Sequence, residues 1–193
     1  VNGIDLLNDA ATARIPGTKA GDLLVSLRSS SALVVLDQND GHIEKIISGP
    51  MVAQHSPRVL PDGRIAVFDN LGGLDTKNGS RVLVIDPLSG EDHTIFPVLP
   101  GQPGDDLLAE QQGAINFSAD GKRVLIAETV GGRVFEAEVG SGRTLWQMNA
   151  ISDLRPFQKL TGQTDGKPNL MRVHTQGAQY VTLADLRQIG RAH

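Results

Sequence analysis

Short apolar runs separated by turns recur along the chain. Three stretches, at about 12–50, 53–98 and 112–149, follow the same order: strand-like runs rich in Val, Ile and Leu, then a turn of Gly, Asp, Asn, Pro or Ser, then a further run. Runs of this kind, bounded by turn residues, are typical of β-strands. The repeat length of roughly 40 residues is the period of a four-stranded propeller blade.

The sequence therefore predicts an all-β fold in which residues 1–149 form about three β-propeller blades, each a four-stranded antiparallel sheet. A β-sandwich or a simple meander would also space its strands evenly and is the alternative fold. Propellers usually have about four to eight blades, and an open array would leave sheet edges unpaired. We therefore expect either a longer parent chain or a ring that closes between copies, which would make the protein a homo-oligomer.

The remaining segments have weaker patterns. Residues 150–193 are polar and are expected to form an irregular extension with a candidate short helix at 182–189. Residues 97–112 carry three prolines and are expected to be a loop between blades. The chain begins at Val1 without a signal peptide, and we expect a fragment rather than a mature or trimmed protein.

Composition argues against several classes of function. The net charge is −4 and the 18 basic residues form no cluster, which argues against binding to nucleic acid. No apolar run approaches the ~20 residues that a membrane-spanning helix needs. The chain has no cysteine, so thiolate–zinc sites, disulfides and a cysteine nucleophile are excluded.

The strongest chemical candidate is His55, in the run Gln54-His55-Ser56-Pro57-Arg58. A Pro-Asp-Gly turn follows at 61–63, and then an apolar strand that ends in Phe-Asp-Asn at 68–70. This layout predicts an imidazole on the rim of a strand, where β folds usually carry their chemistry. The alternative is a histidine that only hydrogen-bonds the backbone of its own turn.

The other polar candidates have simpler interpretations. Asp69 and Asn70 are expected to cap a strand end, and Trp146 is expected to pack between blades. The glycine pair at 72–73 is not followed by a predicted helix, so it is not a glycine-rich phosphate loop. No metal and no cofactor is predicted, because no other histidine has a partner at ligand spacing; these are His42, His93, His174 and His193.

Four motifs occur in order along residues 1–149. They are Ser26-Leu27-Arg28; the 54–58 run with Phe68-Asp69-Asn70; Ser80-Arg81-Val82 with Ile85-Asp86-Pro87; and Gly132-Arg133-Val134-Phe135-Glu136 with Leu145-Trp146. This ordered set resembles the arylsulfate sulfotransferase family, the β-propeller enzymes that need no nucleotide sulfate donor. Residues 150–193 are not clearly covered by the resemblance.

The resemblance implies a six-bladed propeller that moves a sulfuryl group from an aryl sulfate donor to a phenolic acceptor through a sulfohistidine. It assigns His55 as the nucleophile and Arg28 as the arginine that holds the sulfate. It matches Asn2 to the asparagine of the family's His-x-Asn element, whose histidine would precede Val1. It also implies a periplasmic, cell-envelope or secreted location, and small-molecule partners rather than nucleic acid or a membrane span.

These residue types suit sulfuryl transfer. Charge spreads over the sulfuryl oxygens much as in phosphoryl transfer, so positioning and cations carry the catalysis. A neutral imidazole, with a reference pKa of ~6.5, can act as the nucleophile. Arg28 could hold two oxygens at once, unless it is a strand residue paired with a carboxylate. Arg58 is a further candidate for substrate binding, unless it is a solvated strand residue.

Two rival functions stay open at this point. Propellers host many functions, so a non-catalytic propeller that serves as a binding or structural platform is the main alternative. A lyase or lactonase-type propeller built around a metal ion is a weaker one.

Overall fold

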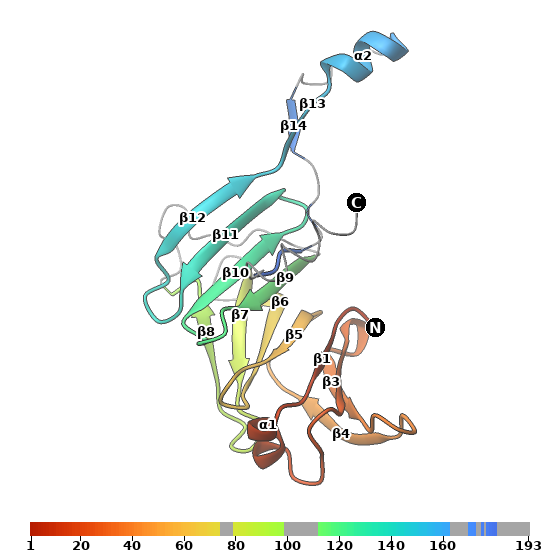
Figure 1. The fold of residues 1–193 in the computed structure, drawn as a ribbon, viewed down its shortest axis with the longest axis vertical. Helices are drawn as coiled ribbons and strands as arrows, with labels where there is room; N and C mark the ends of the chain where they lie inside the picture. The colour runs from red at the N-terminus through yellow and green to blue at the C-terminus, as the bar shows by residue number, and fades with distance from the viewer. Residues whose placement is uncertain (74–78, 99–111, 163–169, 173–174, 176, 181–193) are drawn as a thin grey trace, which may run out of the picture.

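Three four-stranded antiparallel sheets make up most of the molecule (Figure 1). The computed structural model describes residues 1–73, 79–98, 112–162, 170–172, 175 and 177–180. The first sheet contains β1 (Ile4–Leu6), β2 (Leu23–Leu27), β3 (Ala32–Leu36) and β4 (Ile43–Ser48). The second contains β5 (His55–Val59), β6 (Ile65–Gly73), β7 (Gly79–Ile85) and β8 (Asp92–Phe96). The third contains β9 (Gly113–Phe117), β10 (Arg123–Glu128), β11 (Arg133–Glu138) and β12 (Thr144–Asn149).

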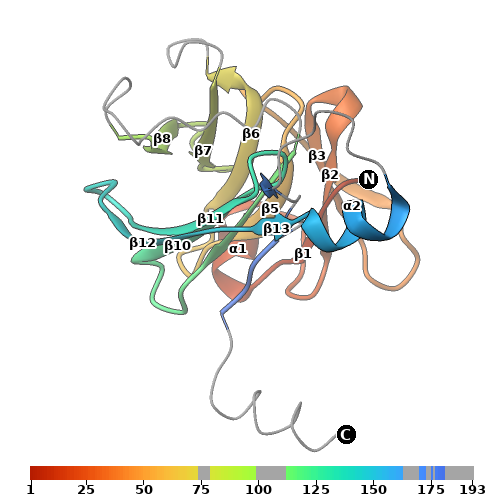
Figure 2. The same cartoon turned by 90° about the horizontal axis from the view of Figure 1, so that it is seen from above.

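In each sheet the strands lie in chain order, each antiparallel to its neighbour. Figure 1 shows the three sheets following one another around an arc, and Figure 2 shows the same stack from above. This meander of four strands is the arrangement of a propeller blade. The predicted all-β fold with blade-like sheets is therefore confirmed.

The hydrophobic core lies in two layers, one on each side of the second sheet. Alternate residues of β6 enter the two layers: Ile65 and Val67 pack with the first sheet, whereas Ala66 and Phe68 pack with the third. Since both faces of this strand are buried, its sequence is a continuous apolar run and does not alternate with polar residues.

A short helix that the sequence pattern did not reveal, α1 (Asp9–Arg14), connects β1 to β2. The Asn8 side chain caps it, accepting a hydrogen bond from the Ala11 amide at 2.8 Å, and donates to the Leu60 carbonyl at 2.9 Å. This helix separates the first two strands of the first sheet. The sheet therefore begins at Ile4, whereas the sequence repeat predicted a first blade that begins at about residue 12.

The C-terminal extension contains β13 (Ile151–Asp153), α2 (Arg155–Thr161) and β14 (Leu170–Arg172), which reach away from the third sheet (Figure 1). The helix expected at 182–189 and most of the loop expected at 97–112 lie outside the described residues. In the part of the chain that the structure describes, no helix is long and apolar enough to cross a membrane.

The expectation that Trp146 packs between blades is wrong. This residue lies on the outermost strand of the third sheet, and 46% of its surface is exposed. Its indole donates to the Glu136 carboxylate on the adjacent strand at 3.0 Å. The polar end of the ring therefore pairs within its own sheet.

Gly63 offers a test of how the first and second sheets approach each other. Its φ is +83°, and a Cβ there would lie 2.3 Å from the Ala10 carbonyl of α1. Gly63→Ala should lower the free energy of unfolding by roughly 2–3 kcal/mol, because it adds a backbone clash to the left-handed strain. Gly41 is the matched control: its φ is +75° and nothing lies within 4 Å, so Gly41→Ala should cost only about 1 kcal/mol. Equal shifts of the two urea-denaturation curves would contradict this packing.

Candidate functional site

The starts of the three inner strands meet around one cavity. Asn2 precedes β1, His55 opens β5, and Gln112 with Gly113 opens β9. The cavity has a volume of about 660 Å³. It is lined by Asn2, Gly3, Ile4, His55, Ser56, Arg58, Gln112, Gly113, Ala114, Asn116, Thr129, Gly177, Ala178 and Gln179. These residues come from all three sheets and from the segment after β14.

The lining favours an anion. It includes a guanidinium from Arg58, an imidazole from His55 and the neutral amides of Asn2, Gln112, Asn116 and Gln179, and it includes no carboxylate. An anion in this cavity would therefore meet hydrogen-bond donors and a positive charge without a like charge among the lining residues.

His55 is half-buried at this cavity and is held in its neutral form. Burial lowers the pKa of the imidazole below its usual value of 6.5, and the positive charge of Arg28 lowers it further. The Ala53 carbonyl, which accepts from the ring, acts in the opposite direction. The net effect is a lowered pKa, so the ring is uncharged at neutral pH.

One carbonyl group orients the His55 ring. Nδ1 lies 3.2 Å from the Ala53 oxygen, and a carbonyl can only accept, so this contact favours the tautomer with its proton on Nδ1. The Asn70 amide donates to the same oxygen and also contacts Nδ1, where a donated hydrogen bond would require the other tautomer. In the tautomer that the Ala53 contact favours, the free lone pair of the imidazole lies on Nε2.

An ion pair with a fully buried carboxylate holds the loop that carries this carbonyl. Asp69 accepts from the Val52 amide at 2.7 Å and from the Arg81 guanidinium at 2.8 Å. Arg81 also donates to the Pro50 carbonyl at 3.0 Å. Asp69 and Asn70, predicted only to cap a strand, thus fix the loop in front of His55. No local pattern indicates this role, because Val52 and Arg81 lie 17 and 12 residues from Asp69 along the chain.

The backbone around His55 is strained. Among the described residues, three non-glycine residues have a φ in the left-handed region: Ser31 (48°), Ala53 (54°) and Ser56 (51°). Two flank His55, and the third ends the short 3-10 helix η1 (Arg28–Ser30). Such conformations cost about 1–3 kcal/mol each and cluster at functional sites. The strain therefore makes this region a candidate functional site, independently of any motif.

Side-chain hydrogen bonds tie these strained residues together. The Ser31 hydroxyl accepts from the Ala53 amide at 3.1 Å. The buried Gln54 amide donates to the Ala32 carbonyl at 2.9 Å, so the loop before β5 is fixed to the start of β3. Ser56 exchanges hydrogen bonds of 3.1 Å with the backbone of Ile115, which fixes β5 to β9.

The structure brings three of the four predicted site residues to one cavity: Asn2, His55 and Arg58. The Asn2 amide donates to the Gln54 carbonyl at 2.8 Å, and Arg58 donates to the Pro57 carbonyl at 2.8 Å. Arg28 does not line the cavity, although its charge acts on His55.

The cavity wall opposite β1 was missed by sequence reasoning. It comes from Gln112–Ala114 and from the segment 177–179. The segment is anchored by Thr175, whose amide donates to the Thr129 carbonyl at 3.1 Å, and by Tyr180, whose hydroxyl donates to Glu136 at 2.7 Å. Small and neutral residues in an irregular tail carry no sequence signal for a cavity wall.

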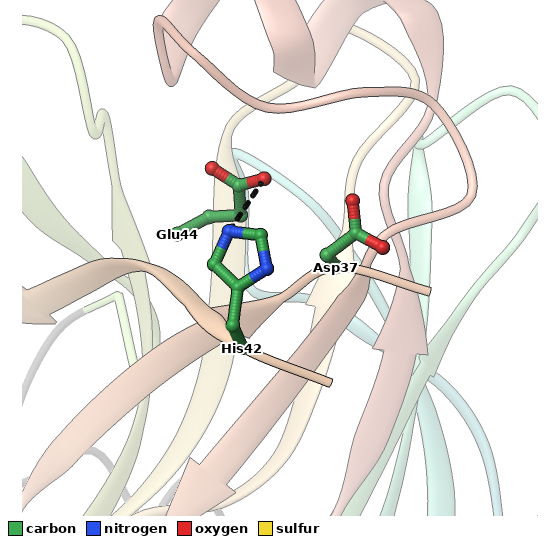
Figure 3. A group of neighbouring side chains, drawn as sticks. All are labelled: Asp37, His42 and Glu44. Carbon is green, nitrogen blue, oxygen red and sulfur yellow. Dashed lines mark ion pairs between the residues drawn. The ribbon is translucent and has the colours of Figure 1, made fainter. Parts of the chain in front are cut away.

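A second cluster of potential ligand groups lies at the turn between β3 and β4 (Figure 3). Asp37 already accepts from the Asn39 amide at 2.7 Å and from Lys19 at 3.0 Å, and these bonds lower its pKa. His42 contacts Asp40 at 2.6 Å and Glu44 at 3.3 Å, and Asp40 raises the pKa of this histidine. Since the carboxylates of this cluster already accept hydrogen bonds or pair with His42 and Lys19, we interpret the cluster as an ion-paired turn.

Comparison with known families identifies the family of this chain. The profile of the arylsulfotransferase (ASST) family matches residues 6–150. The chain belongs to the arylsulfotransferase family. This match covers the second and third sheets, the first sheet from Leu6 onward, and the start of the cavity wall at 112–116. No curated protein matches this arylsulfotransferase-family chain.

Solved structures similar to the chain include several propeller-containing proteins. Hydrazine synthase of Kuenenia stuttgartiensis has 16% identity and a TM-score of 0.45, covering 67% of this chain and 32% of that one. Virginiamycin B lyase of Staphylococcus aureus has 13% identity and a TM-score of 0.45, covering 77% and 40%. The Cps50 (Swd1) β-propeller domain of Myceliophteria thermophila has 16% identity and a TM-score of 0.46, covering 77% and 43%. The chain thus spans between 32% and 43% of these proteins.

The support of His55 by Asn70 can be tested without an activity assay. Asn70→Ala removes a buried donor from the Ala53 carbonyl, so it should lower the free energy of unfolding by about 1–3 kcal/mol. Nitrogen-15 NMR should show a His55 proton on Nδ1 in the unmodified protein, and a larger share of that tautomer in the variant, because the variant has lost the competing Asn70 donor. Asn39→Ala, in an exposed turn, is the control and should leave His55 unchanged. A proton on Nε2 of the unmodified protein would contradict the assignment.

Proposed function

We propose that this chain carries part of a sulfuryl-transfer site in which His55 accepts the sulfuryl group of an aryl sulfate and passes it to a phenol. The observation that carries the proposal is a neutral imidazole, oriented by the Ala53 carbonyl, at a cavity without carboxylates. Membership of the arylsulfotransferase family supports the reaction type. The lone pair on Nε2 is the group that this chemistry requires.

The first step is an in-line displacement at sulfur. The Nε2 lone pair forms an N–S bond as the bond between sulfur and the aryl oxygen breaks, and the aryl oxygen leaves as a phenolate. In the second step the oxygen of the acceptor phenol attacks sulfur, the N–S bond breaks, and the acceptor proton passes to solvent or to the departing phenolate. The imidazole regains its lone pair, so the two steps balance without an oxidant, a reductant or a metal.

The two arginines have different roles in this proposal. Arg58 lines the cavity and supplies the positive charge that faces sulfate oxygens there. Burial lowers the pKa of His55 and the charge of Arg28 lowers it further, so Arg28 helps to keep the nucleophile uncharged at neutral pH. A role of Arg28 in holding the sulfate directly, as the family resemblance implies, would need the side chain to turn toward the cavity.

Asn2 and the wall residues would position the substrate. Asn2 is fixed by its hydrogen bond to Gln54, which leaves its side chain beside His55 at the cavity. Neutral amides hydrogen-bond sulfate or phenol oxygens without adding charge. The aromatic rings of donor and acceptor would lie against the small residues Gly113, Ala114 and Ala178, which leave space for them.

Removal of the nucleophile is the direct test. With 4-nitrophenyl sulfate as donor and phenol as acceptor, we expect nitrophenol release by the protein and at least about a 10³-fold lower rate for His55→Ala. Mass spectrometry of the quenched reaction should find one sulfuryl group on the peptide that contains His55. His42→Ala is the control, since this exposed histidine lies in the β3–β4 turn. No release by the unmodified protein, or equal release by His55→Ala, would sink the proposal.

The pH dependence gives a second test. The neutral imidazole is the reactive form, so kcat/KM should rise with pH through the pKa of His55, and the midpoint of this rise should lie below pH 6.5, because that pKa is lowered. Arg28→Met removes a positive charge that disfavours protonation, so the acidic limb should move to higher pH. Profiles from about pH 4 to about pH 8 would measure this. A limb that moves to lower pH, or does not move, would contradict the role of Arg28.

A further inference from the structure

A second cavity adjoins the one that contains His55. The first cavity lies where the inner strands β1, β5 and β9 begin, and the second lies where the same three strands end. The second has a volume of about 510 Å³. Ile4, Arg58 and Asn116 line both cavities. A ligand bound at His55 that is long enough would therefore extend into the second cavity.

Strands β1 and β5 lie side by side along both cavities. At the first cavity the Asn2 side chain donates to the Gln54 carbonyl at 2.8 Å. At the second, the Val59 amide donates to the Asp5 carboxylate at 2.7 Å. Strand β5 has five residues from His55 to Val59, so these two ends are at most about 13 Å apart. A sulfuryl group, a phenol ring and a two-carbon arm together span a distance of this order.

The second cavity differs from the first in having a carboxylate in its lining. Asp5 is partly buried and accepts from the Val59 amide through one of its oxygens. Its other oxygen has no hydrogen bond or ion pair in the part of the chain that the structure describes. A carboxylate only accepts, and its strongest partners are cationic donors. A ligand group beside Asp5 is therefore expected to be a donor, and an ammonium group suits it best.

Two other polar groups that line the second cavity are already engaged within the protein. The Asn8 side chain caps α1 and donates to the Leu60 carbonyl. The Ser118 hydroxyl donates to the Asp120 carboxylate at 2.6 Å. Asp5 is thus the lining residue that offers a ligand a charged acceptor.

Arg58 and the apolar residues define the remainder of this cavity. Arg58 forms no ion pair among the described residues, and in the proposed reaction its charge faces the sulfuryl oxygens. With that charge balanced by the bound sulfuryl group, Asp5 carries the charge that a ligand meets in the second cavity. The apolar lining residues are Ile4, Val59, Pro61, Phe117 and Ala119.

We infer that the second cavity holds the arm of an amine-bearing phenol, a substrate with a short apolar arm that ends in an ammonium group. The phenol oxygen lies at His55, the arm passes along the apolar residues, and the ammonium group pairs with Asp5. This inference rests on the proposed sulfuryl transfer for the phenol, whereas the amine site is measured by binding alone.

Tyramine and 4-ethylphenol test the inference, because they differ mainly in the ammonium group on the arm. An NMR titration of the full chain should show tyramine binding at least about fivefold more tightly than 4-ethylphenol, since Asp5 attracts the cation. The Val59 amide signal should move with tyramine, because this amide donates to Asp5. The difference in affinity should narrow as sodium chloride is raised from about 20 mM to about 500 mM.

Asp5→Asn removes the charge but keeps an oxygen that accepts from the Val59 amide, so the variant should fold. In this variant the two phenols should bind equally. Asp92→Asn is the matched control, because it makes the same change at an exposed position on β8, and it should keep the preference for tyramine. His55→Ala should also keep the preference, since it removes the nucleophile and leaves Asp5 in place.

Equal affinities for the two phenols in the unmodified protein would overturn the inference. A preference for tyramine that persists in Asp5→Asn, or that does not weaken with salt, would overturn it as well. A preference that depends on Asp5, in a protein that releases no nitrophenol from 4-nitrophenyl sulfate, would support the amine site and overturn the proposed sulfuryl transfer. The two proposals therefore fail separately.

Discussion

Burial of both faces of the second sheet is the constraint on which the remaining structure depends. Burial of apolar surface between sheets stabilises the folded state by about 25 cal/mol per Å². In this molecule such burial occurs in two adjacent layers. The packing leaves little space: a Cβ on Gly113 would lie 2.2 Å from the Phe68 ring. The distance between β6 and β9 is therefore set by the core. Because the inner strands begin at the cavity, the core also fixes the positions of His55 and Gln112.

A second constraint acts in front of the histidine. The loop through Ala53 has a left-handed residue and would relax if it were free. It is held because the buried Asp69–Arg81 pair engages Val52 and Pro50, and Asn70 engages Ala53. Burial of a charge pair is favourable only when its remaining hydrogen bonds are made, as they are here. The same bonds that compensate the buried charge thus orient the imidazole, which links the stability of the second blade to the chemistry proposed for it.

Most strands could be predicted, because a strand needs only apolar residues at short range and a turn at each end. The 65–68 and 82–85 runs show this, with glycine and proline turns beside them. Helix α1 could not be predicted: six residues are too few to be stable alone, and the helix depends on the Asn8 cap and on the distant Leu60 carbonyl. Trp146 was misplaced for a related reason, since an aromatic residue on a strand gives no sign of which strand is outermost.

For the site, the sequence by itself determined the residue types: a histidine on a strand rim, arginines near it and the family motifs around them. Only the tertiary structure decided that Arg58 lines the cavity while Arg28 acts on His55 through its charge, and that Asn70 fixes the ring. The reason is physical. Residue type and strand period are local properties of the chain, whereas the burial of a side chain, the electrostatic field on it and its hydrogen-bond geometry come from segments that meet only when the sheets pack together.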